Sequence, residues 1–405
     1  MSNLNHDELI EVQKDVSEEQ ISTQSQSTAT FDFQINDALF KFVELSNLEK
    51  NVSLTGKPRK MWLDILKRFL KNYIAVFSLI VILAIFTISV IVPAISPYSA
   101  TKPVSEISLD WITNLPPSYA PVVTEILDNS RFQRIQEIQA SNPDLKILID
   151  YKNLGSEYMV TYNKYLLVNT LMGEGHSINL LLGSNNLGID IWTRTWFATR
   201  DSITLAFLVA TTDAIIGITI GSILGFYAGT WIDTIFTRVI DVIINIPTLI
   251  WFLMLITIVP AINQFTLYLI LISIGWVYMV NNSRLWMITV KDQEFILAAK
   301  SIGVSTPRQI FIHGLPMIIG KLATNYVRRI VIVILSLSSL TFLGFLSTTG
   351  NPNLGTLLQE ARTQIDINIW VLLLPSLILL FFSLASQFVA NGLHDALDPK
   401  VGRGK

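Results

Sequence analysis

The chain has 405 residues, of which 51% are hydrophobic and only 15% are charged, and its mean hydropathy is +0.49. In a soluble domain roughly a quarter of the residues are charged, so these values indicate a membrane protein. The formal net charge of −2 gives no overall field that favours nucleic acid, and the lack of cysteine excludes disulfides, cysteine-ligated zinc and thiol catalysis. Because the apolar residues occur in long blocks, we predict an all-α polytopic membrane protein.

The N-terminal part of the chain is polar. Residues 1 to about 30 are rich in Ser, Thr, Gln and Glu, and we predict that 1–56 form a largely disordered cytoplasmic extension. This extension has no early apolar core flanked by positive charge, so we expect no cleaved signal peptide. Phe31–Leu48 is more apolar and predicts a short helix or a partly ordered tail.

A basic amphipathic segment follows at 57–72 and leads into the first apolar run, 73–95. Its apolar side chains share one helical face and its basic side chains lie elsewhere. This pattern predicts a helix on the membrane surface, followed by a first span that is long enough to cross once. The apolar face consists of Trp62, Ile65, Leu66, Phe69 and Leu70.

Residues 96–200 form a long polar segment that we place outside the membrane, on the side opposite the N-terminus. Within it, 119–180 is predicted to be a small folded α+β insertion. The pattern over Val122–Gln139 is that of an amphipathic helix, and Leu145–Tyr151 and Tyr158–Val168 are typical of strands.

The apolar runs resume within 201–391 and bring the expected number of spans to about six. They are Ile203–Tyr227, Val239–Val259, Phe265–Val280, Tyr326–Leu346 and Ile369–Ala390. Lys and Arg gather in alternate short loops, which places both termini, including the tail 392–405, in the cytoplasm. Arg328 and Arg329 stand at the start of a span, and we expect them to extend to the inner interface.

The second span carries a glycine stripe and one carboxylate. Small residues at every fourth position let another helix approach closely in lipid, so we predict a helix-packing face. It comprises Gly217, Gly221, Gly225 and Gly229. Asp213 lies one turn before the stripe. It is a candidate pathway residue, since a buried carboxylate in lipid is costly. We expect it to face either a water-filled cavity or an arginine.

The sequence shows no nucleotide or metal site. The segment Gly314–Leu322 has a glycine spacing one residue too long for a phosphate-binding loop, and it lacks the Ser or Thr that would bind magnesium. The four histidines show no ligand spacing. We therefore expect that this chain binds no cofactor or metal and has no catalytic residues.

A polar, basic loop at 294–316 interrupts the apolar runs. Ala298 and Ala299 favour a helix, and Gly303 is a natural C-cap. The sequence Ser-Thr-Pro before Arg308 is typical of the start of a second helix. Two short helices at a bend, ending at His313, Leu315 and Pro316, predict a soluble knob between two spans.

This loop resembles the cytoplasmic coupling loop of ABC-transporter permeases, whose pattern is Glu-Ala-Ala, three residues, Gly, then His-x-Leu-Pro. The alanines, Gly303, His313, Leu315 and Pro316 match in order and spacing, and Leu297 occupies the Glu position. Outside the insertion, the chain from Trp62 to Lys400 resembles the dipeptide/oligopeptide branch of these permeases. Further matches are Leu182-Gly183-Ser184-Asn185, Leu187-Gly188, Asp190, Arg194, Arg200, Arg238, Asp241, Pro247, Gly275-Trp276, Arg284, Phe342-Leu343-Gly344, Leu393 and Asp395–Pro399. Ile189 and Ala198 depart from the pattern of the branch.

The resemblance implies the type I ABC importer permease fold and a role as the second permease of an oligopeptide importer in a prokaryotic cell membrane. The implied partners are a homologous permease, two ATP-binding subunits that hold ATP and Mg²⁺, an extracellular binding protein, the peptide and the bilayer, without nucleic acid. Nickel, opines or antimicrobial peptides remain alternative cargoes. A secondary transporter would show paired internal repeats, which we do not find, and a membrane-anchored interaction protein would not need several spans.

Overall fold

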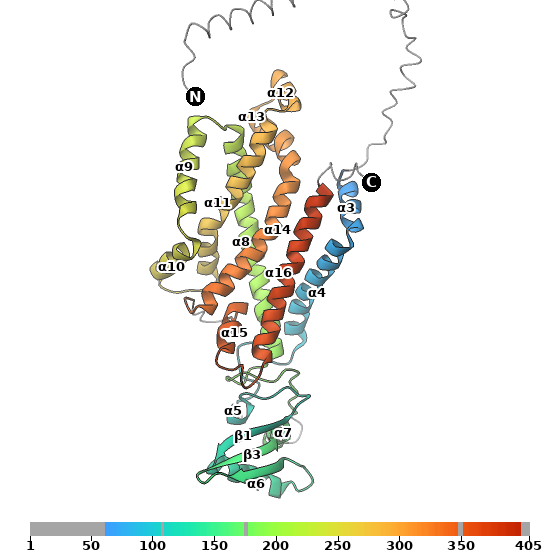
Figure 1. Cartoon of the computed structure of the whole chain (residues 1–405), viewed down its shortest axis with the longest axis vertical. Coiled ribbons are helices and arrows are strands. Elements are labelled where there is room, and N and C mark those ends of the chain that lie inside the picture. Colours follow the sequence, from blue (N-terminus) through green and yellow to red (C-terminus); the bar gives the residue numbers. More distant parts are fainter. Residues whose placement is uncertain (1–60, 107–108, 174–176, 347–350, 398–405) are drawn as a thin grey trace, which may run out of the picture. The chain divides into compact units, whose positions relative to one another are not determined.

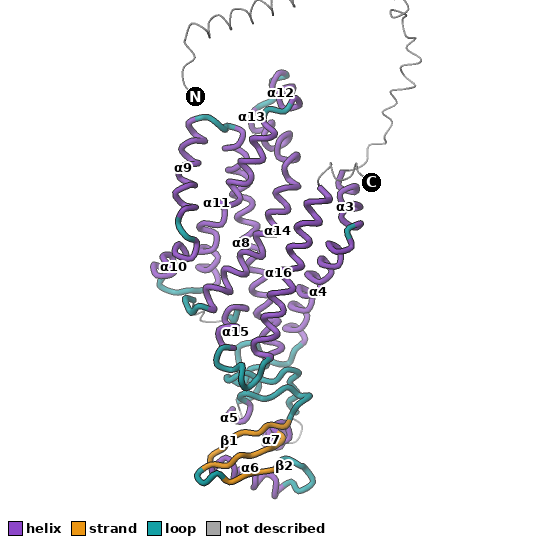
Figure 2. The backbone as a smooth tube through the Cα atoms, viewed as in Figure 1, coloured by secondary structure: helices purple, strands orange, loops and turns teal. Residues whose placement is uncertain are grey.

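The structure is a computed structural model that describes residues 61–106, 109–173, 177–346 and 351–397 (Figure 1). The predicted extension 1–56, the first residues of the amphipathic segment and the end of the tail lie outside these ranges. Helices predominate in the described part, and the strands are confined to one region between α4 and α8 (Figure 2). The predicted all-α membrane fold with a small α+β insertion is thereby confirmed.

The membrane part is a bundle of long helices with shorter helices at its ends. Their bounds are α3 Met61–Lys71, α4 Tyr73–Ile95, α8 Ile191–Phe226, α9 Trp231–Asn245, α10 Thr248–Ile258, α11 Gln264–Lys291, α14 Leu315–Phe342, α15 Leu354–Ala361 and α16 Trp370–Leu397. Within the described residues, α4, α8, α11 and α16 are long and apolar enough to cross a membrane. The bent pair α9–α10 makes a fifth candidate. The 28-residue α14 contains most of the remaining expected span and carries three basic residues, Lys321, Arg328 and Arg329.

The candidate span predicted at Val239–Val259 is broken in the structure. The chain there forms two helices, α9 and α10, whose axes differ by 85°. Ile246 between them is extended (φ −79°, ψ 122°) because Pro247 follows it. Proline disfavours helical geometry in the residue before it and has no N–H to donate, so the helix ends here.

Helix α8 begins twelve residues before the predicted start of its span, at Ile191 instead of Ile203. Its extra turns contain several polar residues, and Asp190 and Arg194 tie these turns to neighbouring groups. The Asp190 carboxylate caps the helix by accepting the N–H of Thr193 at 2.9 Å. Arg194 forms a 2.6 Å ion pair with Glu360 of α15 and donates to the carbonyl of Ala100 at 2.9 Å. Apolarity alone therefore marks the continuous apolar part of this helix and misses its buried but partly polar first turns.

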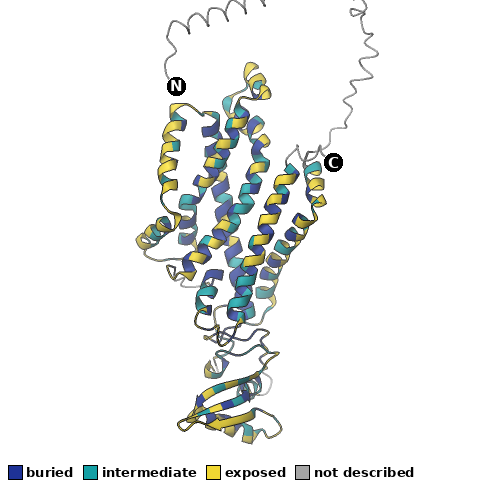
Figure 3. Ribbon diagram, viewed as in Figure 1, coloured by how far each residue is buried: buried dark blue, intermediate teal, exposed yellow. Residues whose placement is uncertain are grey.

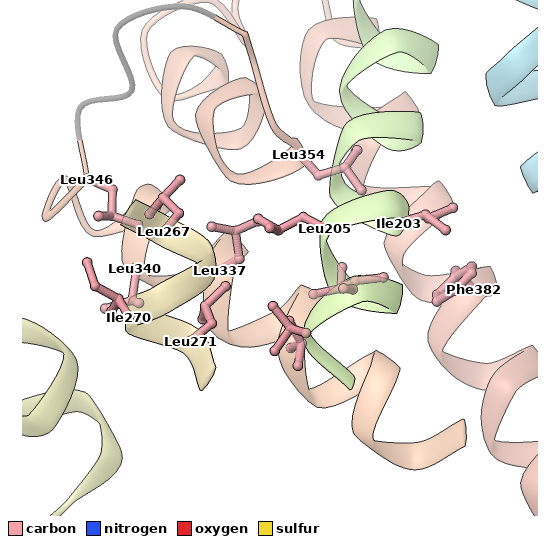
Figure 4. Packing of buried hydrophobic residues seen from close by; sticks show 14 of the residues in the cluster. Ile203, Leu205, Leu267, Ile270, Leu271, Leu337, Leu340, Leu346, Leu354 and Phe382 are labelled. Atoms are coloured by element: carbon pink, nitrogen blue, oxygen red, sulfur yellow. The ribbon is translucent and has the colours of Figure 1, made fainter. Parts of the chain in front are cut away.

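The largest apolar core joins α4, α8, α10, α11, α14, α15 and α16, whose side chains interdigitate near the α15 end of the bundle (Figure 4). Leu205 of α8, Leu271 of α11 and Leu337 of α14 belong to this core and are almost fully buried. The outward faces of α9 and α10 are exposed in this chain (Figure 3). Most of the exposed side chains there are apolar, as expected of a surface that faces lipid or another membrane subunit, and the exposed pair Arg238–Asp241 is an exception.

The insertion is a three-stranded antiparallel sheet in the order β1-β3-β2 with two helices. Its elements are β1 Val122–Asp128, α6 Asn129–Ser141, β2 Leu148–Asn153, β3 Glu157–Asn163 and α7 Lys164–Met172. Phe132, Ile135 and Ile138 of α6 pack against Val160 and Tyr162 of β3. The single helix predicted over Val122–Gln139 is wrong, because its first half pairs with β3 as strand β1. The strand predicted at Tyr158–Val168 likewise ends early, at Asn163, whose side chain caps α7.

A second small core links the insertion to the chain that precedes it. Tyr165 and Val168 of α7 pack with Leu115 and with Ile112 of the short helix α5 (Leu109–Ile112). The Tyr165 hydroxyl donates to the carbonyls of Pro116 and Leu180 at 2.9 and 3.0 Å. The boundary expected at 119 therefore divides one packed cluster.

Candidate functional site

The loop between α11 and α14 contains two short helices at a bend, α12 (Glu294–Ser301) and α13 (Thr306–Arg308), followed by a turn of π-helix, η2 (Gln309–Gly314). The bend is a complete Schellman motif. The N–H of Val304 donates to the carbonyl of Ala299 at 3.1 Å, and the N–H of Gly303 donates to that of Lys300 at 3.0 Å. Gly303 has φ +81°, a conformation that glycine adopts without strain.

The inner side of this loop is anchored to the ends of α11 and α14. Ile296 of α12 and Ile310 of η2 are buried with Met287 of α11 and Ile318 of α14. The buried side chain of Gln309 donates to the carbonyl of Val304 at 2.6 Å, which ties η2 to the bend. The sequence analysis did not single out these residues, because the loop also contains apolar residues that are exposed, such as Leu297 and Ile302, so local sequence does not distinguish the inward face.

The outer side of the loop is exposed and largely apolar, flanked by basic residues (Figure 3). Ile302 at the tip is 82% exposed, and Leu297 is 49% exposed. Ala298 and Arg308 are also exposed, while Ala299, His313 and Leu315 are half-buried and Pro316 lies in the exposed first turn of α14. The residues predicted for this site thus divide into an outward set and a set that contacts the bundle. An exposed apolar tip on a packed base is typical of a docking surface.

The glycine stripe of α8 meets α11. A Cβ atom on Gly217 would collide with Met279, one on Gly221 would collide with the Val280 carbonyl, and one on Gly225 would lie 2.5 Å from the carbonyl oxygen of Arg284. Because three successive turns leave no room for a side chain, the two backbones are in direct contact. Gly229 lies beyond the end of α8 with φ +90° and open space around it, so it is not part of this contact.

Asp213 is fully buried in α8 and forms an ion pair with Arg329 of α14, with Nε 2.8 Å from Oδ2. Asp213 was expected to face either a water-filled cavity or an arginine, and in the structure it faces the arginine. Arg329 is 8% exposed, so the expectation that it extends to the interface is wrong. Gly275 of α11 forms one wall of this pair, since a Cβ there would overlap both charged groups.

Asp233 of α9 accepts two hydrogen bonds from the Arg284 guanidinium of α11, at 2.5 and 2.8 Å. It also accepts the N–H of Gly229 at 3.1 Å. This bidentate pair holds α9 on the bundle next to the loop. Within the described residues no group of three or more potential metal ligands occurs.

Comparison with known proteins shows which protein family this chain resembles. Residues 217–403 match the family model of the binding-protein-dependent transport system inner membrane component, and residues 60–117 match the N-terminal transmembrane domain of oligopeptide transport permease C. The oligopeptide transport system permease protein OppC of Mycoplasma genitalium is 33% identical over 90% of this chain and 96% of its own length. The chain belongs to the binding-protein-dependent transport permease family.

Other relatives cover the same region. The OppC protein of Mycoplasma pneumoniae is 30% identical over 91% of this chain and 98% of its own length. The dipeptide transport system permease protein DppC of Haemophilus influenzae is 33% identical over 56% of this chain and 77% of its own length. The family resemblance stated from the sequence is thereby confirmed, and this permease is a multi-pass membrane protein.

Proposed function

We propose that this permease forms half of the translocation pathway of an ATP-driven peptide importer. Its relatives are named oligopeptide and dipeptide transport permeases, which supports peptide as the cargo. The observation that carries the mechanism is the loop 294–316, whose apolar tip is exposed while its base is packed against α11 and α14. ATP and Mg²⁺ belong to separate ATP-binding subunits, and this chain hydrolyses nothing itself.

In this mechanism an ATP-binding subunit receives the tip around Ile302. Because Ile296 and Ile310 join the loop to two different helices, displacement of the loop moves the ends of α11 and α14 together. A second permease covers the exposed apolar faces of α9 and α10, and an extracellular binding protein delivers peptide at the end that carries the insertion. Both termini then lie in the cytoplasm of a prokaryotic cell.

The test is copurification of the tagged chain in mild detergent, followed by assay of peptide-stimulated ATP hydrolysis. Wild type is expected to recover a second permease and ATPase subunits. Ile302→Asp places a charge on an 82% exposed side chain, so it is expected to reduce ATPase recovery at least tenfold without unfolding the chain.

The matched control is Ile126→Asp, which makes the same change at a 58% exposed position in the insertion and should leave ATPase recovery unchanged. A chain that purifies alone and moves solute into vesicles without ATP would refute the importer assignment. Equal ATPase recovery with Ile302→Asp and wild type would refute the role of the loop.

A further inference from the structure

A cavity of about 280 Å³ lies between α11, α14 and α16 near the end of the bundle that carries the loop. Its lining is mostly polar and basic. On α14, two basic residues two helical turns apart share one face with the polar residues between them, and α16 presents the opposite wall. The lining residues are Trp286, Lys321, Thr324, Asn325, Arg328, Asn391, His394 and Asp395.

Among the described residues, the two cations in this cavity, Lys321 and Arg328, have no anionic partner. Lys321 places its ammonium 3.7 Å from the centroid of the Trp286 ring. Arg328 donates from Nη2 to the Asn391 side chain at 3.1 Å, while its buried Nε has no partner. In the part of the chain that the structure describes, neither residue forms an ion pair with a carboxylate. Asp395, the one carboxylate among the lining residues, lies 3.6 Å from His394.

The cavity lies at the level of the membrane surface. On the other side of α16, Gly392 packs directly on Ala75, in the first turn of α4. Phe69 of α3 also packs in this region, against Val389 and Ala396. Because α3 is amphipathic and basic and leads into the first span, its level is that of the lipid headgroups.

Exposed apolar side chains continue from the cavity toward the middle of the membrane on both walls. On α16, Leu384 and Phe388 precede Asn391 at helical spacing and are 47% and 46% exposed. On α14, Ile332 and Leu335 follow Arg328 on the same face and are each 42% exposed. A cationic pocket at the headgroup level, with exposed apolar side chains leading from it toward the middle of the membrane, has the chemistry of a phospholipid site.

We propose that this cavity binds the phosphate headgroup of an anionic phospholipid, with Lys321 and Arg328 as its ligands and the acyl chains along α14 and α16. Trp286 positions the Lys321 ammonium through a cation–π contact, and Asn391 holds Arg328 toward the headgroup level. The proposal goes beyond the transport function and requires only that the chain spans a membrane.

The test is titration of the purified full chain with phosphatidylglycerol or phosphatidylcholine, with bound lipids counted by native mass spectrometry. Each basic residue near an anionic surface contributes roughly a fivefold factor in affinity, so Lys321→Gln with Arg328→Gln should weaken one phosphatidylglycerol site roughly 30-fold. Phosphatidylcholine binding should not change. The control pair, Arg134→Gln with Lys152→Gln, makes the same charge change in the insertion and should retain the site.

Two further variants keep the test decisive if the neutralised pair misfolds. Lys321→Arg with Arg328→Lys keeps the charge and should retain the site, whereas Asn325→Leu fills the cavity without changing the charge and should lose it. Equal phosphatidylglycerol binding in all variants would overturn the proposal. Displacement of the lipid by excess inorganic phosphate would identify the cavity as a site for free phosphate only. Loss of peptide uptake in the variants with unchanged lipid binding would assign the cavity to cargo. Either result would overturn the lipid proposal.

Discussion

The buried Asp213–Arg329 pair gives the sharpest quantitative prediction. Asp213 is fully buried and Arg329 is 8% exposed, so removing one partner leaves an uncompensated charge inside the bundle. Such a loss costs about 3–5 kcal/mol, whereas replacing both partners by apolar residues of similar volume is often neutral. Asp213→Leu and Arg329→Met are each expected to lower the free energy of unfolding by about 3–5 kcal/mol, and the double variant should recover most of this loss.

The assay is a double-mutant cycle. The free energy of unfolding of wild type, both single variants and the double variant is measured by titrating the protein in mild detergent with a denaturing detergent. A coupling energy of several kcal/mol, with the double variant more stable than either single variant, is expected. If the two single losses simply add in the double variant, the charges do not act as a pair and the reasoning fails.

Gly275 offers an independent check on the same pair. A Cβ atom at this position would overlap both charged groups, so Gly275→Ala should destabilise the bundle by about 1–3 kcal/mol through overpacking. This loss should largely disappear in the background of the double variant if Leu and Met can move aside. An unchanged loss in that background would show that the glycine is needed for helix contact alone.

Three further predictions concern other contacts. Gly221→Ala should push α8 away from α11 and lower the free energy of unfolding by about 1–3 kcal/mol. In the control variant Gly229→Ala the added Cβ meets no atom within 4 Å, so only backbone strain of roughly 1 kcal/mol is expected. Equal losses in the two variants would contradict the direct backbone contact. Arg284→Gln removes the bidentate bond to Asp233 and should speed amide hydrogen exchange in α9 but not in α4; uniform acceleration would point to global unfolding instead. Asp128 accepts hydrogen bonds from the Arg131 N–H and the Ser130 hydroxyl, which hold the pKa of its carboxyl below the ordinary value of 3.8. A lowered folded-state pKa stabilises the fold above pH 3.8, and this stabilisation is lost as the pH falls through the folded-state pKa. Asp128→Asn removes the titrating group, so the melting temperature of this variant should fall less steeply with acid than that of wild type. An unchanged slope would contradict this prediction.

The sequence alone predicted the features that rest on local chemistry. Long apolar runs placed α4, α8, α11 and α16, and Gly303 followed by Ser-Thr-Pro located the bend of the loop. The break at Pro247 was missed, although the residue before a proline avoids helical geometry and the signal was present in the sequence. The strand β1 was misread as part of a helix, since Val122–Asp128 runs without interruption into the periodic pattern of α6.

Features that depend on long-range contacts were not predictable. Asp213 and Arg329 are 116 positions apart, and nothing in either local sequence identifies the other as its partner. The glycine stripe showed a packing face but did not show that it contacts α11. Likewise, the basic positions of α14 looked equivalent in sequence, yet Arg329 points into the bundle and Arg328 toward the cavity, because their directions differ by about 100° around the helix.

The contact between α8 and α11 also limits how the permease can change shape. Carbonyl groups of α11 rest directly against the glycines of α8 over three turns, so neither helix can slide along or rotate against the other without a steric clash. We therefore expect these two helices to travel as one rigid body during transport. Any displacement of the loop 294–316 that moves the end of α11 should then carry α8 with it, so the glycine contact would transmit the movement of the loop beyond the two helices that flank it.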